Sequence, residues 1–239
     1  MRYLYGPVHS RRLGLSLGIT LTPYKVCPFD CIYCQLGKTT VKAIERRSYL
    51  DVQEILTELR EFLETADFKL STLDYISLSG FGEPTLNIGI ATLISQIKKL
   101  TSVPVALITN AALFSCPELL RDIQEVDLVV PSLDAVTQDI FEQIDRPVLN
   151  LKIENVINGL IALREEFKGR IYLEIMLVEG INDGLDYAYK FKEVIKRIRP
   201  DKIQLNTPVR VRAQAGAGLV NKEKLLQIKN ILGENCEII

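Results

Sequence analysis

The chain has 239 residues, of which 47% are hydrophobic, enough to build the core of one large domain. Its net charge is −1, so the composition gives no global basic excess of the kind that announces a nucleic-acid-binding protein. No apolar run reaches membrane-spanning length, and the N-terminal MRYLYGPVHSRRLG lacks the apolar segment of a signal peptide. These features predict a soluble cytoplasmic protein with no membrane partner.

The charge is unevenly distributed along the chain. Residues 1–47 carry eight Lys or Arg against Asp30 and Glu45, which gives +6 there and −7 in the remainder. Two interpretations fit this segment: a solvated basic surface, or a site for an anionic partner.

Six short apolar runs predict β-strands. Their nearly continuous apolar character indicates strands buried on both faces, as in a parallel sheet. In chain order they span residues 15–21, 74–79, 103–109, 126–132, 171–178 and 201–206.

Amphipathic segments with helical spacing separate these runs. Capping residues predict where several of the helices begin, and Pro200 predicts where the fifth one ends. The markers in chain order are Asp51 with Glu54, Asn87, Ser115 with Pro117, the stripe from Ile153 to Leu160, the stripe from Tyr187 to Ile198, and Asn221.

Strands that alternate with helices in this way predict right-handed βα units. The fold class is α/β, a partial (β/α)6 TIM-like barrel. The expected single domain, 1–239, has an N-terminal segment at about 1–14, the barrel at 15–210, and a C-terminal loop and helix at 211–239. Chemistry in such barrels collects on the loops that follow the strands, where this chain carries CPFDCIYC, GFGEP, TNA, SLDA, GIND and NTPVRVR.

The run CPFDCIYC places Cys27, Cys31 and Cys34 within reach of one inorganic cluster. Thiolates are soft ligands that select iron–sulfur clusters or zinc. Zinc would require a fourth Cys or His, and the ferredoxin spacing C-x2-C-x2-C-x3-C is absent. A three-ligand [4Fe–4S] cluster is therefore favoured over zinc, a purely redox cluster or three structural thiols. The five cysteines, three of them clustered, also indicate a reducing compartment rather than a disulfide framework.

With this motif the chain resembles the radical S-adenosylmethionine (radical SAM) superfamily, whose signature is C-x3-C-x-aromatic-C after the first barrel strand. The resemblance implies that S-adenosylmethionine chelates the iron that the protein leaves free. It implies that the reduced cluster cleaves this cofactor to a 5′-deoxyadenosyl radical, which abstracts hydrogen from the substrate. It also implies an electron donor of flavodoxin or ferredoxin type.

The segment SGFGEPT is similar to the glycine–glutamate motif of that superfamily. Gly80, Phe81 and Gly82 would approach the cofactor closely, and Glu83 would accept a hydrogen bond from its ammonium group. A simple turn at the end of a strand is the alternative.

Two further pairs of polar residues end the next strands. The resemblance implies that Thr109 and Asn110 lie near the methionine and ribose of the cofactor, and that Ser132 and Asp134 contact the ribose hydroxyls. Capping is the alternative for both pairs, because such residues are common in loops between strands and helices.

The remaining candidates lie on the last two strands and in the cysteine run. Glu174 and Met176 share one face of their strand; in the barrel lumen, Glu174 would be a buried carboxylate that needs a partner, while Met176 fits a filler role equally well. The resemblance implies contacts to adenine from Asn206, Pro208 and Tyr33.

Arg210 and Arg212, together with the basic N-terminal segment, could bind phosphate or carboxylate groups of a substrate. A solvated surface is again the alternative.

The segments GPVHSRRLG and NTPVR most resemble those of the branch that contains the wyosine synthases, which modify transfer RNA. The cysteines of a second cluster found in that branch are missing here, so their reaction is not carried over. Three functions are therefore considered: a radical SAM enzyme that acts on transfer RNA or another anionic substrate, an activase that places a glycyl radical on a partner protein, and a non-catalytic iron–sulfur electron-transfer protein.

Overall fold

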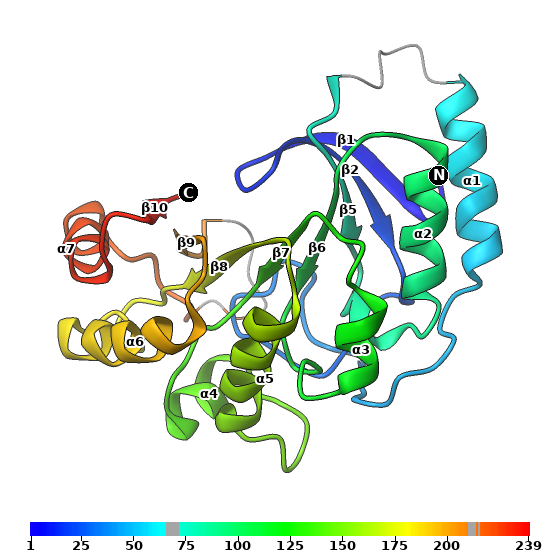
Figure 1. Ribbon diagram of the computed structural model, residues 1–239. Helices are drawn as coiled ribbons and strands as arrows, with labels where there is room; N and C mark the ends of the chain where they lie inside the picture. The colour runs from blue at the N-terminus through cyan, green and yellow to red at the C-terminus, as the bar shows by residue number, and fades with distance from the viewer. Residues whose placement is uncertain (66–71, 210–213, 215) are drawn as a thin grey trace.

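One eight-stranded sheet, in the order β1-β2-β5-β6-β7-β8-β9-β10, organises the computed structural model (Figure 1). β1 and β2 are antiparallel, and all later neighbours are parallel. The strands are β1 (Leu4–Ser10), β2 (Gly14–Thr20), β5 (Tyr75–Ser79), β6 (Val105–Thr109), β7 (Leu128–Pro131), β8 (Arg170–Met176), β9 (Lys202–Asn206) and β10 (Cys236–Ile238). The structure describes residues 1–65, 72–209, 214 and 216–239.

Helices follow the outer side of the curved sheet, from α1 and α2 beside the first strands to α6 and α7 beside the last (Figure 1). Within the described ranges, no helix combines the length and apolar character needed to cross a membrane. The helices are α1 (Val52–Thr65), α2 (Ile90–Leu100), α3 (Pro117–Asp122), α4 (Gln138–Ile144), α5 (Ile153–Glu166), α6 (Leu185–Ile198) and α7 (Lys222–Leu232).

The predicted partial (β/α)6 barrel is confirmed. All six predicted strands are present, as β2 and β5 to β9, and they lie side by side in chain order with helices between them. The structure adds edge strands β1 and β10, helix α4, and a two-residue pair formed by β3 (Val26–Cys27) and β4 (Val41–Lys42). Because β3 contains the first clustered cysteine, this small pair belongs to the candidate site.

The two edges of the sheet approach each other at the hairpin between β1 and β2. The Arg11 guanidinium in this hairpin donates a hydrogen bond to the carbonyl of Ile239, directly after β10, at 3.2 Å. The sheet is therefore curved strongly enough for its first and last strands to be bridged by one side chain.

Helix starts agree with the sequence only in part. Asn221 caps α7 as predicted, because its side chain accepts a backbone N–H bond of 2.9 Å from the first turn. Asn87 does not begin α2, which starts at Ile90; its side-chain amide instead donates to two backbone carbonyls at 2.9 and 3.0 Å. Cys116, not Ser115, occupies the N-cap position of α3.

The hydrophobic core fills the space between the sheet and the helices. Strand residues such as Ile76 and Leu78 are fully buried, and so is the apolar stripe of α1 that includes Ile55, Leu56 and Leu59. Ser77, on the opposite face of β5 from Ile76 and Leu78, is also buried, so both faces of this strand are covered.

We expect Ile76→Ala to lower the free energy of unfolding by about 2–5 kcal/mol, because it leaves a cavity in a fully buried strand. Ile88→Ala is the matched control, since the Ile88 side chain is 53% exposed. Urea denaturation followed by circular dichroism measures both. Equal losses in the two variants would contradict the burial of β5 at the centre of the core.

Candidate functional site

The three clustered cysteines lie at the ends of the barrel strands, in the segment that follows β2. Cys27 is in β3, where it is the register partner of Lys42 in β4, and Cys31 and Cys34 lie in the loop that follows. All three side chains are half-buried free thiols. The loop therefore presents three sulfur atoms on the face of the barrel where the sequence predicts chemistry.

The end of α4 holds this loop through its backbone. The N–H of Asp30 donates to the carbonyl of Asp145, and the N–H of Ile32 donates to that of Ile144, each at 2.9 Å. The sequence QDIFEQI has helical apolar spacing, but it is too short to stand out as a helix, so the sequence did not predict this support.

The loop after β5 packs against the segment that enters the cysteine loop. A Cβ at position 82 would lie 2.0 Å from the carbonyl oxygen of Val26, so only glycine fits there. Gly80 has φ +107, a conformation that favours glycine. The N–H of Lys25 donates to the carbonyl of Phe81 at 2.6 Å. The glycines of GFGEP therefore allow one backbone to lie directly on another beside Cys27.

Glu83 joins the same loop to the end of β6. Its Oε1 accepts from the N–H and hydroxyl of Thr85 (3.1 and 2.6 Å) and from the hydroxyl of Thr109 (2.6 Å), and its Oε2 accepts from the N–H of Asn110 (2.8 Å). Burial raises the pKa of Glu83, although these hydrogen bonds act in the opposite direction. The carboxylate thus binds two other predicted site residues, Thr109 and Asn110.

Two nitrogen donors point at the cysteine sulfurs. The side-chain amide of Asn110 donates to Sγ of Cys27 at 3.3 Å, and Nζ of Lys25 donates to Sγ of Cys34 at 3.0 Å. Burial raises the pKa of Cys27 to about 12, so this thiol is neutral without a bound cation. The sequence does not single out Lys25 as a cluster-site residue, because it is one of eight basic residues spread over residues 1–47.

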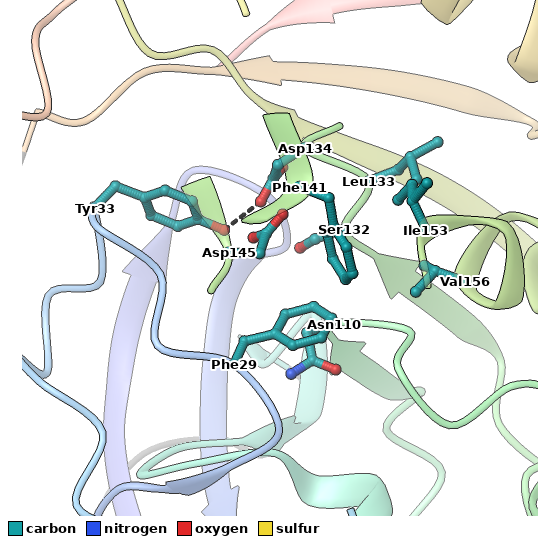
Figure 2. A pocket seen from close by; sticks show the side chains of 10 residues that line it. All are labelled: Phe29, Tyr33, Asn110, Ser132, Leu133, Asp134, Phe141, Asp145, Ile153 and Val156. Carbon is teal, nitrogen blue, oxygen red and sulfur yellow. Dashed lines mark hydrogen bonds between the residues drawn. The ribbon is translucent and has the colours of Figure 1, made fainter. Parts of the chain in front are cut away.

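A buried group of acids lies beside Cys31. The thiol of Cys31 donates to Oδ1 of Asp145 at 3.3 Å, and the Asp145 carboxyl faces that of Asp134 (Figure 2). Asp134 accepts from the Tyr33 hydroxyl and, at 2.8 Å, from the N–H of Met176. Burial raises the pKa of both carboxyl groups. The structure thus connects three predicted residues, Tyr33, Asp134 and Met176, and adds Asp145.

Figure 2 shows a pocket between the cysteine loop and the ends of β6 and β7. Four predicted site residues, Tyr33, Asn110, Ser132 and Asp134, line it. Two more are hydrogen-bonded to these lining residues, Glu83 to Asn110 and Met176 to Asp134. Its lining residues are Phe29, Tyr33, Asn110, Ser132, Leu133, Asp134, Phe141, Asp145, Ile153 and Val156.

Glu174 has the partner that its burial requires. The Arg12 guanidinium binds it through two hydrogen bonds of 2.5 Å, and the Asn206 amide donates to the same carboxylate at 2.8 Å. Burial lowers the pKa of Arg12, but the Glu174 carboxylate more than offsets this and the net shift is upward. Arg12 lies 162 residues away in the chain, so its role could not be read from spacing.

The last predicted residues lie after β9. Pro208 is buried directly beyond this strand. Arg210 and Arg212, the predicted substrate contacts, lie outside the described residues.

Comparisons with known proteins agree on the family. The profile described as "Radical SAM superfamily" matches residues 21–214. A UPF0026 protein of Methanocaldococcus jannaschii is 34% identical over 100% of this chain and 73% of its own length. A probable dual-specificity RNA methyltransferase RlmN of Prochlorococcus marinus is 29% identical over 71% of this chain and 49% of its own length.

A protein of Brachyspira hyodysenteriae named GTPase Obg is 39% identical over 98% of this chain, but the chain spans only 34% of that protein. The phosphate-binding loop G-x-x-x-x-G-K-[ST] of many GTPases is absent here, because Ile32 stands where Gly37-Lys38-Thr39 would need its first glycine. The name of that longer protein therefore does not describe this chain's own motifs.

A solved radical SAM methyltransferase from Sphaerobacter thermophilus has the same fold, with a TM-score of 0.71 over 94% of this chain and 66% of its own. Its sequence identity of 18% makes this a likeness of fold alone. The profile match over residues 21–214, which is most of the sequence, shows the family. The chain belongs to the radical SAM superfamily and is a radical SAM enzyme that uses a [4Fe–4S] cluster and S-adenosylmethionine.

Proposed function

We propose that Cys27, Cys31 and Cys34 bind three irons of the [4Fe–4S] cluster and leave the fourth iron to S-adenosylmethionine. The donor set fits: three cysteines lie within eight residues of the chain, and nitrogen donors reach two of their sulfurs, as in the surroundings of protein-bound clusters. Within the described part of the chain, no three His, Cys, Asp or Glu side chains are close enough to hold a single metal ion. A cubane binds each thiolate through a different iron, so its ligands need not meet at one point.

The cofactor is proposed to lie at the strand ends around the pocket beside the cysteine loop. When bound, the reduced cluster would supply one electron to the sulfonium of S-adenosylmethionine, which would release methionine and a 5′-deoxyadenosyl radical able to take a hydrogen atom from the substrate. The proposed contacts come from all the strand ends that the sequence singled out. They are Tyr33, Gly80, Phe81, Gly82, Glu83, Thr109, Asn110, Ser132, Asp134, Glu174, Met176, Asn206 and Pro208.

We propose RNA as the substrate class, with flavodoxin or ferredoxin as the type of electron donor. The single observation that carries the RNA proposal is the exposure of Lys38, Lys42 and Arg47 in the segment directly after the cysteines. Phosphate groups are the natural partners of such a surface. The similarity to an RlmN methyltransferase, which by its name acts on RNA, supports the same class.

The proposed chemistry is tested by anaerobic reconstitution with iron and sulfide, reduction with dithionite, and assay for 5′-deoxyadenosine. Replacement of any one of Cys27, Cys31 and Cys34 by Ala should abolish the cluster absorption band and this product, because three thiolates are the minimum set. Cys116→Ala is the control: it removes a thiol that is hydrogen-bonded to Glu118 at the start of α3, and it should leave the absorption band and the 5′-deoxyadenosine yield unchanged. A full [4Fe–4S] band in a triad variant would refute the ligand assignment. A loaded and reduced wild-type protein without product would favour the electron-transfer alternative.

We expect Glu83→Gln to weaken the binding of S-adenosylmethionine at least about tenfold, because a charge-assisted hydrogen bond to the cofactor ammonium contributes about 1.5–3 kcal/mol. Iron content should stay at the wild-type level. Equilibrium dialysis with the reconstituted protein measures the affinity, and Glu118→Gln, at an exposed carboxylate, is the control. Unchanged affinity, or loss of iron, would show that Glu83 has only a structural role, in holding the loop after β5 against the end of β6.

RNA binding should weaken steeply with salt. We expect the variant with Lys38, Lys42 and Arg47 changed to Gln to lower the slope of log affinity against log salt by about 2 to 3, as expected for three lost phosphate contacts. Filter binding to bulk transfer RNA measures this slope. Gln substitutions at Lys190, Lys196 and Arg197 on the outer helix α6 remove the same charge and are the control. An equal change of the salt slope in the two sets of variants would contradict a local RNA site.

A radical signal on a co-purified protein would favour the activase alternative.

A further inference from the structure

Lys25 is an unusual residue in the segment that enters the cysteine loop. It is 2% exposed, although lysine is among the residues that proteins bury least. Its φ of +57 lies in the left-handed region, which residues other than glycine rarely adopt. A buried lysine in a disfavoured backbone conformation indicates that its surroundings impose this position.

The backbone of Lys25 is fixed on both sides. Its N–H donates to the carbonyl of Phe81 at 2.6 Å, and its carbonyl accepts from the N–H groups of Thr40 and Val41, each at 3.2 Å. The residue is therefore held between the loop after β5 and the start of β4. The side chain leaves this anchored backbone in a defined direction.

That direction leads to a cysteine sulfur. Nζ of Lys25 donates to Sγ of Cys34 at 3.0 Å. In the described ranges, no Asp or Glu forms an ion pair with Lys25. A buried ammonium group requires a negative partner, and the cysteine thiolate of a bound cluster supplies one.

The electrostatic consequence follows from the change of charge on reduction. A reduced cluster carries one more negative charge than an oxidised one, and a positive hydrogen-bond donor on its sulfur stabilises the reduced form more strongly. Hydrogen bonds to sulfur and local charge are two of the factors that set the reduction potentials of iron–sulfur clusters. Burial strengthens the interaction because solvent screens it less.

We propose that Lys25 is a positioning residue that raises the reduction potential of the [4Fe–4S] cluster through its hydrogen bond to Cys34. The inference rests on the proposed function, since it takes Cys34 as a cluster ligand. It assigns this lysine a role in admitting the electron from the donor, separate from binding of S-adenosylmethionine or substrate.

The test is a mediated redox titration of the reconstituted protein without S-adenosylmethionine, with the reduced cluster counted by electron paramagnetic resonance. Lys25→Met keeps the Cβ and the aliphatic stem, and so the same backbone strain, but removes the charge and the donor. At the wild-type midpoint potential, the ratio of reduced to oxidised cluster should fall at least about tenfold, a lowering of about 59 mV for a one-electron couple.

Two controls separate the direct contact from its alternatives. Lys25→Arg, which keeps charge and donors, should hold the ratio within about threefold of wild type. Lys38→Met removes an exposed charge from the same segment and should change it less than about twofold, because water screens it. If Lys25→Met does not fold, Lys25→Gln is titrated instead, with the same criteria.

Three results would overturn the inference: an unchanged potential in the neutral variant, an equal shift in Lys38→Met, or a folded neutral variant that binds no iron, which would make Lys25 a determinant of cluster retention. Failure of the proposed function is distinct from all of these, because the wild-type protein itself would then hold no [4Fe–4S] cluster.

Discussion

The backbone contact between the loop after β5 and the segment before Cys27 supports the rest of the site. Gly82 lies against the carbonyl of Val26 so closely that any side chain would displace one of the two loops. The N–H of Glu83 donates to that same carbonyl at 3.1 Å. Because β2 and β5 are neighbours in the sheet, the core that positions these strands also positions the cysteine loop. Local stability and site geometry are therefore linked in this protein.

Three buried ionisable side chains in the barrel have well-defined partners. Glu174 is neutralised by Arg12, Glu83 is surrounded by four donors, and Lys25 faces the sulfur of Cys34. Removing Arg12 would leave Glu174 as an unpaired buried charge, which costs several kcal/mol. The lining of the candidate pocket combines apolar side chains such as Phe29 and Phe141 with polar ones such as Asn110 and Asp134.

Only some of the basic residues in the N-terminal segment, residues 1–47, contribute to the surface charge. Arg12 pairs with the buried Glu174, Lys25 donates to the half-buried Cys34, and Arg46 pairs with Asp122 at 2.6 Å. Lys38 and Lys42 are exposed. Counting charges along the chain thus overstates the basic surface, because part of the count serves the interior. Lys38 and Lys42 follow directly after the cysteines in the chain.

The sequence by itself determined the six parallel strands, the order of the βα units and the three clustered thiols. Apolar runs, helical spacing and cysteine spacing are local patterns, and each is complete within about ten residues. Membership of the superfamily followed from the same short motifs.

The tertiary structure decided which side chains meet. Arg12 reaches Glu174 across 162 residues, and Asp145 reaches Cys31 across 114, because the curved sheet and the short helix α4 bring distant segments together. The sequence also did not predict the edge strands β1 and β10, because half-polar strands at a sheet edge have a weak hydrophobic pattern. Contacts of this kind depend on register and curvature, which no local pattern encodes.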